Sequence, residues 1–100
     1  MTIRILQSAF DDLDAGADFY ERCEPGVGGY FVSCLLADID SLVLYAGIHR
    51  VIHGYHRALS KRFPFAIYYR IEDNCVVVHA VLDCRRDPRW IARQLRRRSQ

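Results

Sequence analysis

Arginines gather directly after the most hydrophobic stretch of this sequence. Residues 76–82 read VVVHAVL and the next eight residues read DCRRDPRW, so three arginines follow a predicted buried strand within seven positions. A guanidinium group stays charged at physiological pH and forms paired hydrogen bonds with carboxylates and phosphates. The cluster is therefore suited to an anionic partner, although Arg85 and Arg86 could also form local ion pairs with Asp87.

The charge of the chain is divided between its two halves. Residues 1–50 hold three arginines and eight acidic residues, which gives 3 − 8 = −5, whereas residues 51–100 hold eleven basic and four acidic residues, which gives 11 − 4 = +7. Such asymmetry indicates a basic surface for an anionic partner, or a solvated face without one. For the arginines after residue 90 we expect a solvated, frayed tail.

The remaining reactive side chains indicate no cofactor chemistry. His49, His53 and His56 have spacings that suit one helix face, but nearby glycines argue against a helix and no carboxylate or cysteine lies close in sequence. His79 stands in an apolar strand, and Cys84 lies beside two arginines without an identifiable base. No phosphate-binding loop or dinucleotide fingerprint occurs. We expect no metal, no cofactor and no small-molecule substrate.

Length and composition indicate one soluble domain. The chain has 100 residues, is 51% hydrophobic and 26% charged, and suits a single domain over residues 1–100. No apolar run approaches the roughly 18–20 residues of a membrane span, and the first residues lack the features of a signal peptide. We expect a cytoplasmic protein with no membrane partner and four reduced cysteines.

The periodicity of apolar residues changes from helical to strand-like near residue 47. A helix capped by Ser8 is followed by a break at PGVGG and a second helix, and their short connection predicts an antiparallel helical hairpin. Asp73 and Asn74 suit a two-residue turn between two strands. The expected elements are a strand at 2–7, helices from 8 and at 30–46, strands at 54–61, 66–72 and 75–83, and a basic helix at 90–97 capped by Asp87.

The predicted turn fixes which side chains share a face of the sheet. It places Tyr68 opposite His79, with Arg70 on the same, partly polar face, which could line a groove. The other face should cover the helical hairpin, and a slip of one residue would exchange the two faces. The residues expected on the hairpin side are Ile67, Tyr69, Ile71, Val76, Val78 and Ala80.

The order of elements, with "PGVGGYF", "RALSKRFPFAIYYRIEDN" and "VVVHAVLDCRRDPRW", resembles the RelE/ParE superfamily of toxins from bacterial type II toxin–antitoxin systems. The resemblance is greatest to the ParE-like, plasmid-stabilisation branch. It implies an α+β, two-layer β-α-α-β-β-β fold with an antiparallel sheet on a helical hairpin, plus a short basic C-terminal helix. It also implies a partner, an antitoxin whose C-terminal segment wraps the toxin.

The resemblance implies two alternative activities. ParE-like members inhibit DNA gyrase and have no known catalytic residues, which would make Arg85, Arg86, Arg89 and Trp90 the target-binding residues. RelE-like members enter the ribosome and cut mRNA, but Ala66 stands where they carry a basic residue. A third alternative is a member that binds its antitoxin without toxicity. If the chain were a nuclease, its candidate residues would be Arg57, Lys61, Arg62, Arg70, His79, Arg85 and Arg86.

The second predicted helix is apolar around more of its circumference than one buried stripe requires. An apolar face that is not wholly covered marks a partner site, and a flexible antitoxin segment could fold onto it. Burial between the sheet and the first helix would explain the same pattern. The residues expected to bind the antitoxin are Phe31, Leu35, Leu36, Ile39 and Leu42.

Overall fold

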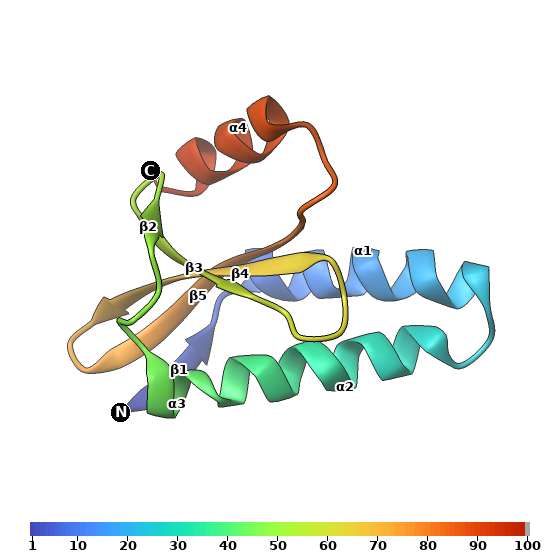
Figure 1. Ribbon diagram of the computed structural model, residues 1–100, viewed down its shortest axis with the longest axis horizontal. Helices are drawn as coiled ribbons and strands as arrows, with labels where there is room; N and C mark the ends of the chain where they lie inside the picture. The colour runs from blue at the N-terminus through green and yellow to red at the C-terminus, as the bar shows by residue number, and fades with distance from the viewer. Residues whose placement is uncertain (100) are drawn as a thin grey trace.

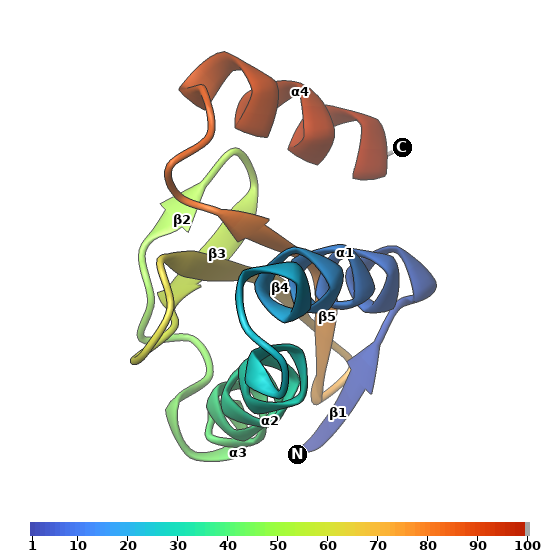
Figure 2. The same cartoon turned by 90° about the vertical axis from the view of Figure 1, so that its right-hand side faces the viewer.

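The computed structural model describes residues 1–99 and shows a five-stranded sheet between two helical layers (Figures 1 and 2). The helical hairpin covers one face of the sheet, and the C-terminal helix covers the other. The elements are β1 (Thr2–Ile5), α1 (Gln7–Cys23), α2 (Val27–Asp40), α3 (Leu42–Tyr45), β2 (Val51–Ile52), β3 (Tyr55–Leu59), β4 (Phe65–Glu72), β5 (Cys75–Asp83) and α4 (Pro88–Arg98).

The sheet has the order β1-β5-β4-β3-β2 and is mixed rather than wholly antiparallel. β1 pairs in parallel with β5, whereas the β5–β4, β4–β3 and β3–β2 pairs are antiparallel. The expected α+β class is confirmed, but the expected antiparallel sheet is corrected at one edge. The parallel pair arises because α1 and α2 carry the chain from β1 across the sheet before its antiparallel strands begin.

A bulge in β5 changes the predicted sharing of faces. The turn at residues 73–74 is confirmed, since Glu72 pairs with Cys75, but further along Tyr69 pairs with Val78 and Tyr68 with Ala80. His79 is thus the extra residue on β5. Because a bulge places two residues opposite one, Ala80 lies on the α4 side with Tyr68 and not, as predicted, on the hairpin side.

Two apolar clusters hold the layers together. The larger lies between the hairpin and the sheet, where the Phe31 ring packs edge-on against Phe63 and Phe65 with ring centroids 5.0 and 4.8 Å apart. The smaller lies beneath α4 and is built around Leu95, which is fully buried. The sheet face that was predicted to line a groove is therefore covered. Residues of the smaller cluster are Tyr55, Ala66, Tyr68, Ala80, Leu82 and Leu95.

The burial of α2 and α3 corrects the predicted antitoxin surface. Phe31, Leu35, Ile39 and Leu42 are 0–1% exposed and face the sheet, so a partner cannot contact their side chains without displacing the core. Leu36 is partly buried against the same cluster. The breadth of the apolar pattern has another source, because Val43, Leu44 and Tyr45 in α3 are exposed.

The apolar stretch of α2 and α3 is longer than predicted, since no apolar run was expected to approach the length of a membrane span. Residues Val27–Tyr45 form a 19-residue helical stretch that by length and composition alone could cross a membrane. Here its buried residues recur at spacings of three and four and pack against the sheet, as in a core helix that covers one face of a sheet. It lies beside α1 along its length (Figure 1).

Ser8 does not cap the first helix. The helix begins at Gln7 with Leu6 in the capping position, and no side chain caps it. The Ser8 hydroxyl instead donates a hydrogen bond of 2.8 Å to the carbonyl oxygen of His79. That carbonyl lies at the bulge, where the ladder between β4 and β5 is interrupted, so the hydroxyl satisfies a backbone group that lacks its strand partner.

Two adjacent glycines in α2 should respond oppositely to alanine. A Cβ on Gly28 would lie 2.7 Å from the Ala17 carbonyl oxygen in α1, whereas a Cβ on Gly29 meets nothing within 4 Å. Gly28→Ala should lower the free energy of unfolding by about 1–3 kcal/mol through overpacking. Gly29→Ala should raise it by about 0.5–1 kcal/mol by favouring the helix. Urea unfolding measures both, and equal effects would contradict the close helix contact.

Candidate functional site

The segment that joins β5 to α4 holds the predicted arginine cluster. Asp87 caps α4 by accepting a hydrogen bond of 2.8 Å from the backbone N–H of Arg89, with Pro88 in the first turn, as predicted. The Arg89 side chain also pairs with Asp87 at 3.2 Å. Both hydrogen bonds favour the carboxylate, and the backbone donor contributes most to holding the pKa of Asp87 below its usual range. The Asp87 cap therefore fixes where α4 begins and, with it, the position of Arg89 and Trp90 at the surface.

Arg85 and Arg86 are fixed by different contacts. The Arg85 guanidinium forms two hydrogen bonds with Asp83, of 2.7 and 3.0 Å, and these side-chain bonds lower the pKa of that carboxyl group. Arg86 lies over the Trp90 ring, 3.6 Å from its centroid. Neither arginine pairs with Asp87, the partner considered from the sequence. The acidic partner of Arg85 is Asp83 instead. Both guanidinium groups thus reach the surface in defined positions.

A cleft of about 330 Å³ opens beside this cluster, between α1 and the start of α4. Its walls include Gly16 and Phe19 of α1 and Phe65 of β4, while Arg86 and Trp90 line the α4 side. Phe19 is 47% exposed. A cleft with apolar walls and a charged rim fits an apolar side chain whose neighbours carry the complementary charge.

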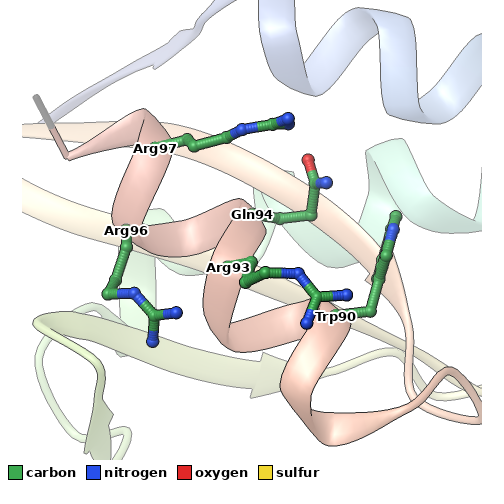
Figure 3. Close-up of a pocket in the computed structure, with 5 residues that line it drawn as sticks. All are labelled: Trp90, Arg93, Gln94, Arg96 and Arg97. Carbon is green, nitrogen blue, oxygen red and sulfur yellow. The ribbon is translucent and has the colours of Figure 1, made fainter.

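The outer face of α4 carries a second basic group. Arg93, Arg96 and Arg97 line, with Trp90 and Gln94, a shallow hollow of about 430 Å³. Figure 3 shows the Arg93 and Arg97 side chains extended toward the Trp90 end of the helix. Arg96 and Arg97 are exposed to solvent as predicted, but the tail is not frayed, because both lie within α4.

Arg98 does not follow that expectation. It turns inward and pairs with Asp12 of α1, with the second of its hydrogen bonds measuring 2.9 Å. The Asp12 carboxylate also accepts a hydrogen bond of 2.9 Å from the Val81 backbone N–H. The paired carboxylate raises the pKa of Arg98. This contact joins α1, β5 and α4, and nothing in the local sequence pattern indicates it.

The structure separates the candidate nuclease residues. Arg57, Arg70 and His79 lie on the α4 side of the sheet, where Arg57 donates to the Tyr68 hydroxyl at 3.3 Å and Arg70 lies over the Tyr55 ring. Lys61 donates its backbone N–H to Asp38 of α2 and lines a hollow with Arg62 there. Arg85 and Arg86 lie beyond β5, so the seven side chains do not form one site.

His79 is 9% exposed, and its Nε2 atom has no hydrogen-bond partner among the described residues. Burial, followed by the nearby Arg70 charge, lowers its pKa below 6.5, although Glu72 lies 3.7 Å away and acts in the opposite direction. The unfolded chain therefore binds a proton more readily below pH 6.5 than the folded chain does. The His79 side chain is thus a source of acid instability.

We expect the free energy of unfolding to fall as the pH drops below about 6.5. His79→Gln should weaken this fall, whereas His53→Gln, in an exposed turn, should not. Urea unfolding at pH 7.5 and 5.5 measures the difference. Equal pH dependence in the parent and the His79→Gln variant would contradict the inferred role of His79.

Two of the other histidines, His49 and His56, pack against one tyrosine. The Tyr69 hydroxyl contacts Nδ1 of His49, and the His56 ring stacks on Tyr69 with centroids 5.0 Å apart. Burial is the main cause that lowers the pKa of His49. Within residues 1–99, no group of three or more histidine, cysteine or acidic side chains could hold a metal ion. The contacts of His49 and His56 with Tyr69 support the loop before β2.

Comparison with known proteins identifies the fold. No protein-family model matches the sequence, and no curated protein does. Among solved structures, a chain of the chromosomal ParDE TA system from P. aeruginosa is similar, with a TM-score of 0.72 and 22% sequence identity. The match covers 81% of this chain and 92% of that chain. The chain therefore shares the fold of this ParDE chain, as the resemblance found in the sequence implied.

Proposed function

We propose that this chain is the toxin of a type II toxin–antitoxin module, that it inhibits DNA gyrase in the cytoplasm, and that a cognate antitoxin neutralises it. The observation that carries the proposal is the arginine cluster at the end of β5, on a fold shared with a ParDE chain. Arg85, Arg86, Arg89 and Trp90 contact the target. Their positions are fixed by Asp83, by the indole ring and by the α4 cap.

Inhibition by binding requires no catalytic residue. The burial of the sheet face beneath α4 supports inhibition by binding over RNA cleavage. Ala66, which stands where RelE-like nucleases carry a basic side chain, is fully buried in the cluster beneath α4. Leu95 covers the same region. An RNA strand could reach this face only after α4 had moved. That movement would expose the apolar side chains of the smaller cluster to water. The helix therefore favours a binding function over nuclease activity on this face.

The antitoxin occupies the cleft between α1 and the start of α4. This replaces the buried surface of α2 with a site that is open to solvent. An apolar antitoxin side chain packs beside Phe19 and Phe65, next to Gly16 of α1. Carboxylates of the antitoxin approach Arg86, while lysine or arginine side chains approach the exposed acids Asp14 and Asp18. A short segment that folds on binding can supply both.

One observation favours the alternative of a ribosome-dependent mRNA endonuclease. Arg57, Tyr68 and His79 share the α4 side of the sheet, and such groups can bind phosphate and move protons. If α4 left the sheet, these side chains would become accessible. The nuclease therefore needs a rearrangement that gyrase inhibition does not need.

Controlled expression in bacterial cells tests the proposal. Induction should stop growth and relax a reporter plasmid, and co-expression of the protein encoded beside this gene should restore growth. Primer extension on cellular mRNA serves as the control for the alternative and should show no new cleavage sites. Codon-dependent cuts with unchanged plasmid topology would overturn gyrase as the target. Normal growth with unchanged topology would indicate a member that only binds its antitoxin.

A further inference from the structure

Beyond Arg89 and Trp90 at its start, the outer face of α4 has no function in the proposed contact with gyrase or antitoxin. Leu95 marks the face of the helix that packs on the sheet. Because an α-helix has 3.6 residues per turn, Arg89, Arg93 and Arg97 project from the opposite side, whereas Arg96 projects from the flank of the helix. Three arginines thus form one stripe, and Arg96 lies at its edge. They follow one another over eight residues, which spans about 12 Å along a rigid helix.

These arginines are available for a partner. Arg89, Arg93, Arg96 and Arg97 are exposed, and within residues 1–99 the last three take part in no ion pair. Arg98, by contrast, is the arginine of α4 that turns toward Asp12. The helix therefore uses one arginine to attach itself to the domain and presents the others to solvent.

The chemistry of the stripe selects among anionic partners. The centre of a protein interface is usually depleted in charged residues and rich in apolar ones, and here only Trp90, at one end, offers an apolar surface. A helix that lies on a membrane needs apolar side chains to insert, but Ile91 and Leu95 of α4 face the sheet and leave only Trp90. Arginines in a row, each with a planar fork of donors, match a regular array of phosphates.

We propose that the outer face of α4 binds the phosphate backbone of double-stranded DNA without sequence preference. Duplex DNA carries one charge per about 3.4 Å on each strand, so a stripe of about 12 Å can meet three to four phosphates. The acidic exposed side of α1, with Asp11, Asp14 and Asp18, repels the DNA and orients the domain with α4 toward it. This binding goes beyond the proposed inhibition of gyrase and does not require it.

Fluorescence anisotropy with a labelled 20-base-pair duplex tests the proposal. Binding by the full chain should weaken between 50 and 200 mM salt with a logarithmic slope of about −3.6 for four phosphates, a loss of roughly 150-fold. Arg93→Gln/Arg96→Gln/Arg97→Gln should make the slope shallower by about 2.7. The same variant should bind at least tenfold more weakly at 50 mM salt. Glutamine keeps a good helix former at each position.

A matched variant controls for net charge. Arg22→Gln/Arg50→Gln/Arg62→Gln removes three exposed arginines away from α4 and should bind the duplex within about twofold of the parent at 50 mM salt. Circular dichroism checks that both variants fold.

Three results would overturn the proposal: no duplex binding by the parent at 50 mM salt, equal losses in the two triple variants, or tighter binding to single-stranded RNA of the same sequence. Loss of gyrase inhibition by the α4 variant with unchanged DNA binding would show that α4 faces a protein. DNA binding without any effect on gyrase would overturn the proposed function and leave this inference intact.

Discussion

Replacing Arg85 and Arg86 together by alanine is expected to abolish growth inhibition while the domain stays folded. The two guanidinium groups reach the surface beside the cleft and carry the charge that the target would meet. Exposed ion pairs and exposed cation–π contacts each contribute about 1 kcal/mol or less to stability. The double variant should therefore melt within a few degrees of the parent. Growth after induction and thermal unfolding by circular dichroism measure the two effects.

The matched control is Arg50→Ala/Arg62→Ala, which removes two exposed arginines elsewhere and gives the same net charge. It should remain as toxic as the parent. Full toxicity of the Arg85→Ala/Arg86→Ala variant would show that the target binds another surface. Unfolding of that variant would show that Arg85 and Asp83 hold the β5–α4 connection in place, contrary to the exposure of Arg85.

Removal of Arg98 should have the largest effect on stability among the arginines. Arg98→Met would leave the Asp12 carboxylate without its charge partner between α1, β5 and α4, and both side chains are less than one-fifth exposed. Breaking a fully buried ion pair costs about 3–5 kcal/mol, and the remaining exposure lowers this to about 2–3 kcal/mol. For a domain of this size the melting temperature should fall by roughly 10–20 °C.

Arg89→Met provides the comparison, because its pair with Asp87 is exposed. It should leave the melting temperature nearly unchanged. Asp12→Asn/Arg98→Met should recover part of the loss, since the amide no longer carries an uncompensated charge but still accepts a hydrogen bond from Val81. A melting temperature of Arg98→Met equal to that of Arg89→Met would contradict the role of Arg98 in attaching α4.

Local patterns were sufficient to predict most elements of the fold. The helical hairpin, the turn at residues 73–74 and the α4 cap at Asp87 depend on spacing, turn chemistry and capping, which neighbouring residues determine. The position of β1 depends on its pairing with β5, which lies more than 70 residues later in the chain. The bulge at His79 shifts the pairing of β4 with β5 partway along the strands. Neither leaves a signal in the adjacent sequence.

In the candidate site, too, contacts between neighbouring residues could be predicted and contacts between distant residues could not. The grouping of Arg85, Arg86, Arg89 and Trp90 follows from their closeness in sequence. The Asp12–Arg98 pair joins residues 86 positions apart, so no local pattern could indicate it. The predicted antitoxin surface was wrong for Phe31, because an apolar helix face looks the same in sequence whether the sheet or a partner covers it. Only burial distinguishes the two cases.

The most direct test of the proposed function is a supercoiling assay with purified gyrase, relaxed plasmid, ATP and increasing amounts of the purified chain. We predict that supercoiling stops as the chain is added. We also predict that the Arg85→Ala/Arg86→Ala variant requires at least a hundredfold higher concentration, while the Arg50→Ala/Arg62→Ala control inhibits like the parent. Undiminished supercoiling at a large molar excess of the folded chain would contradict the proposal that gyrase is its target.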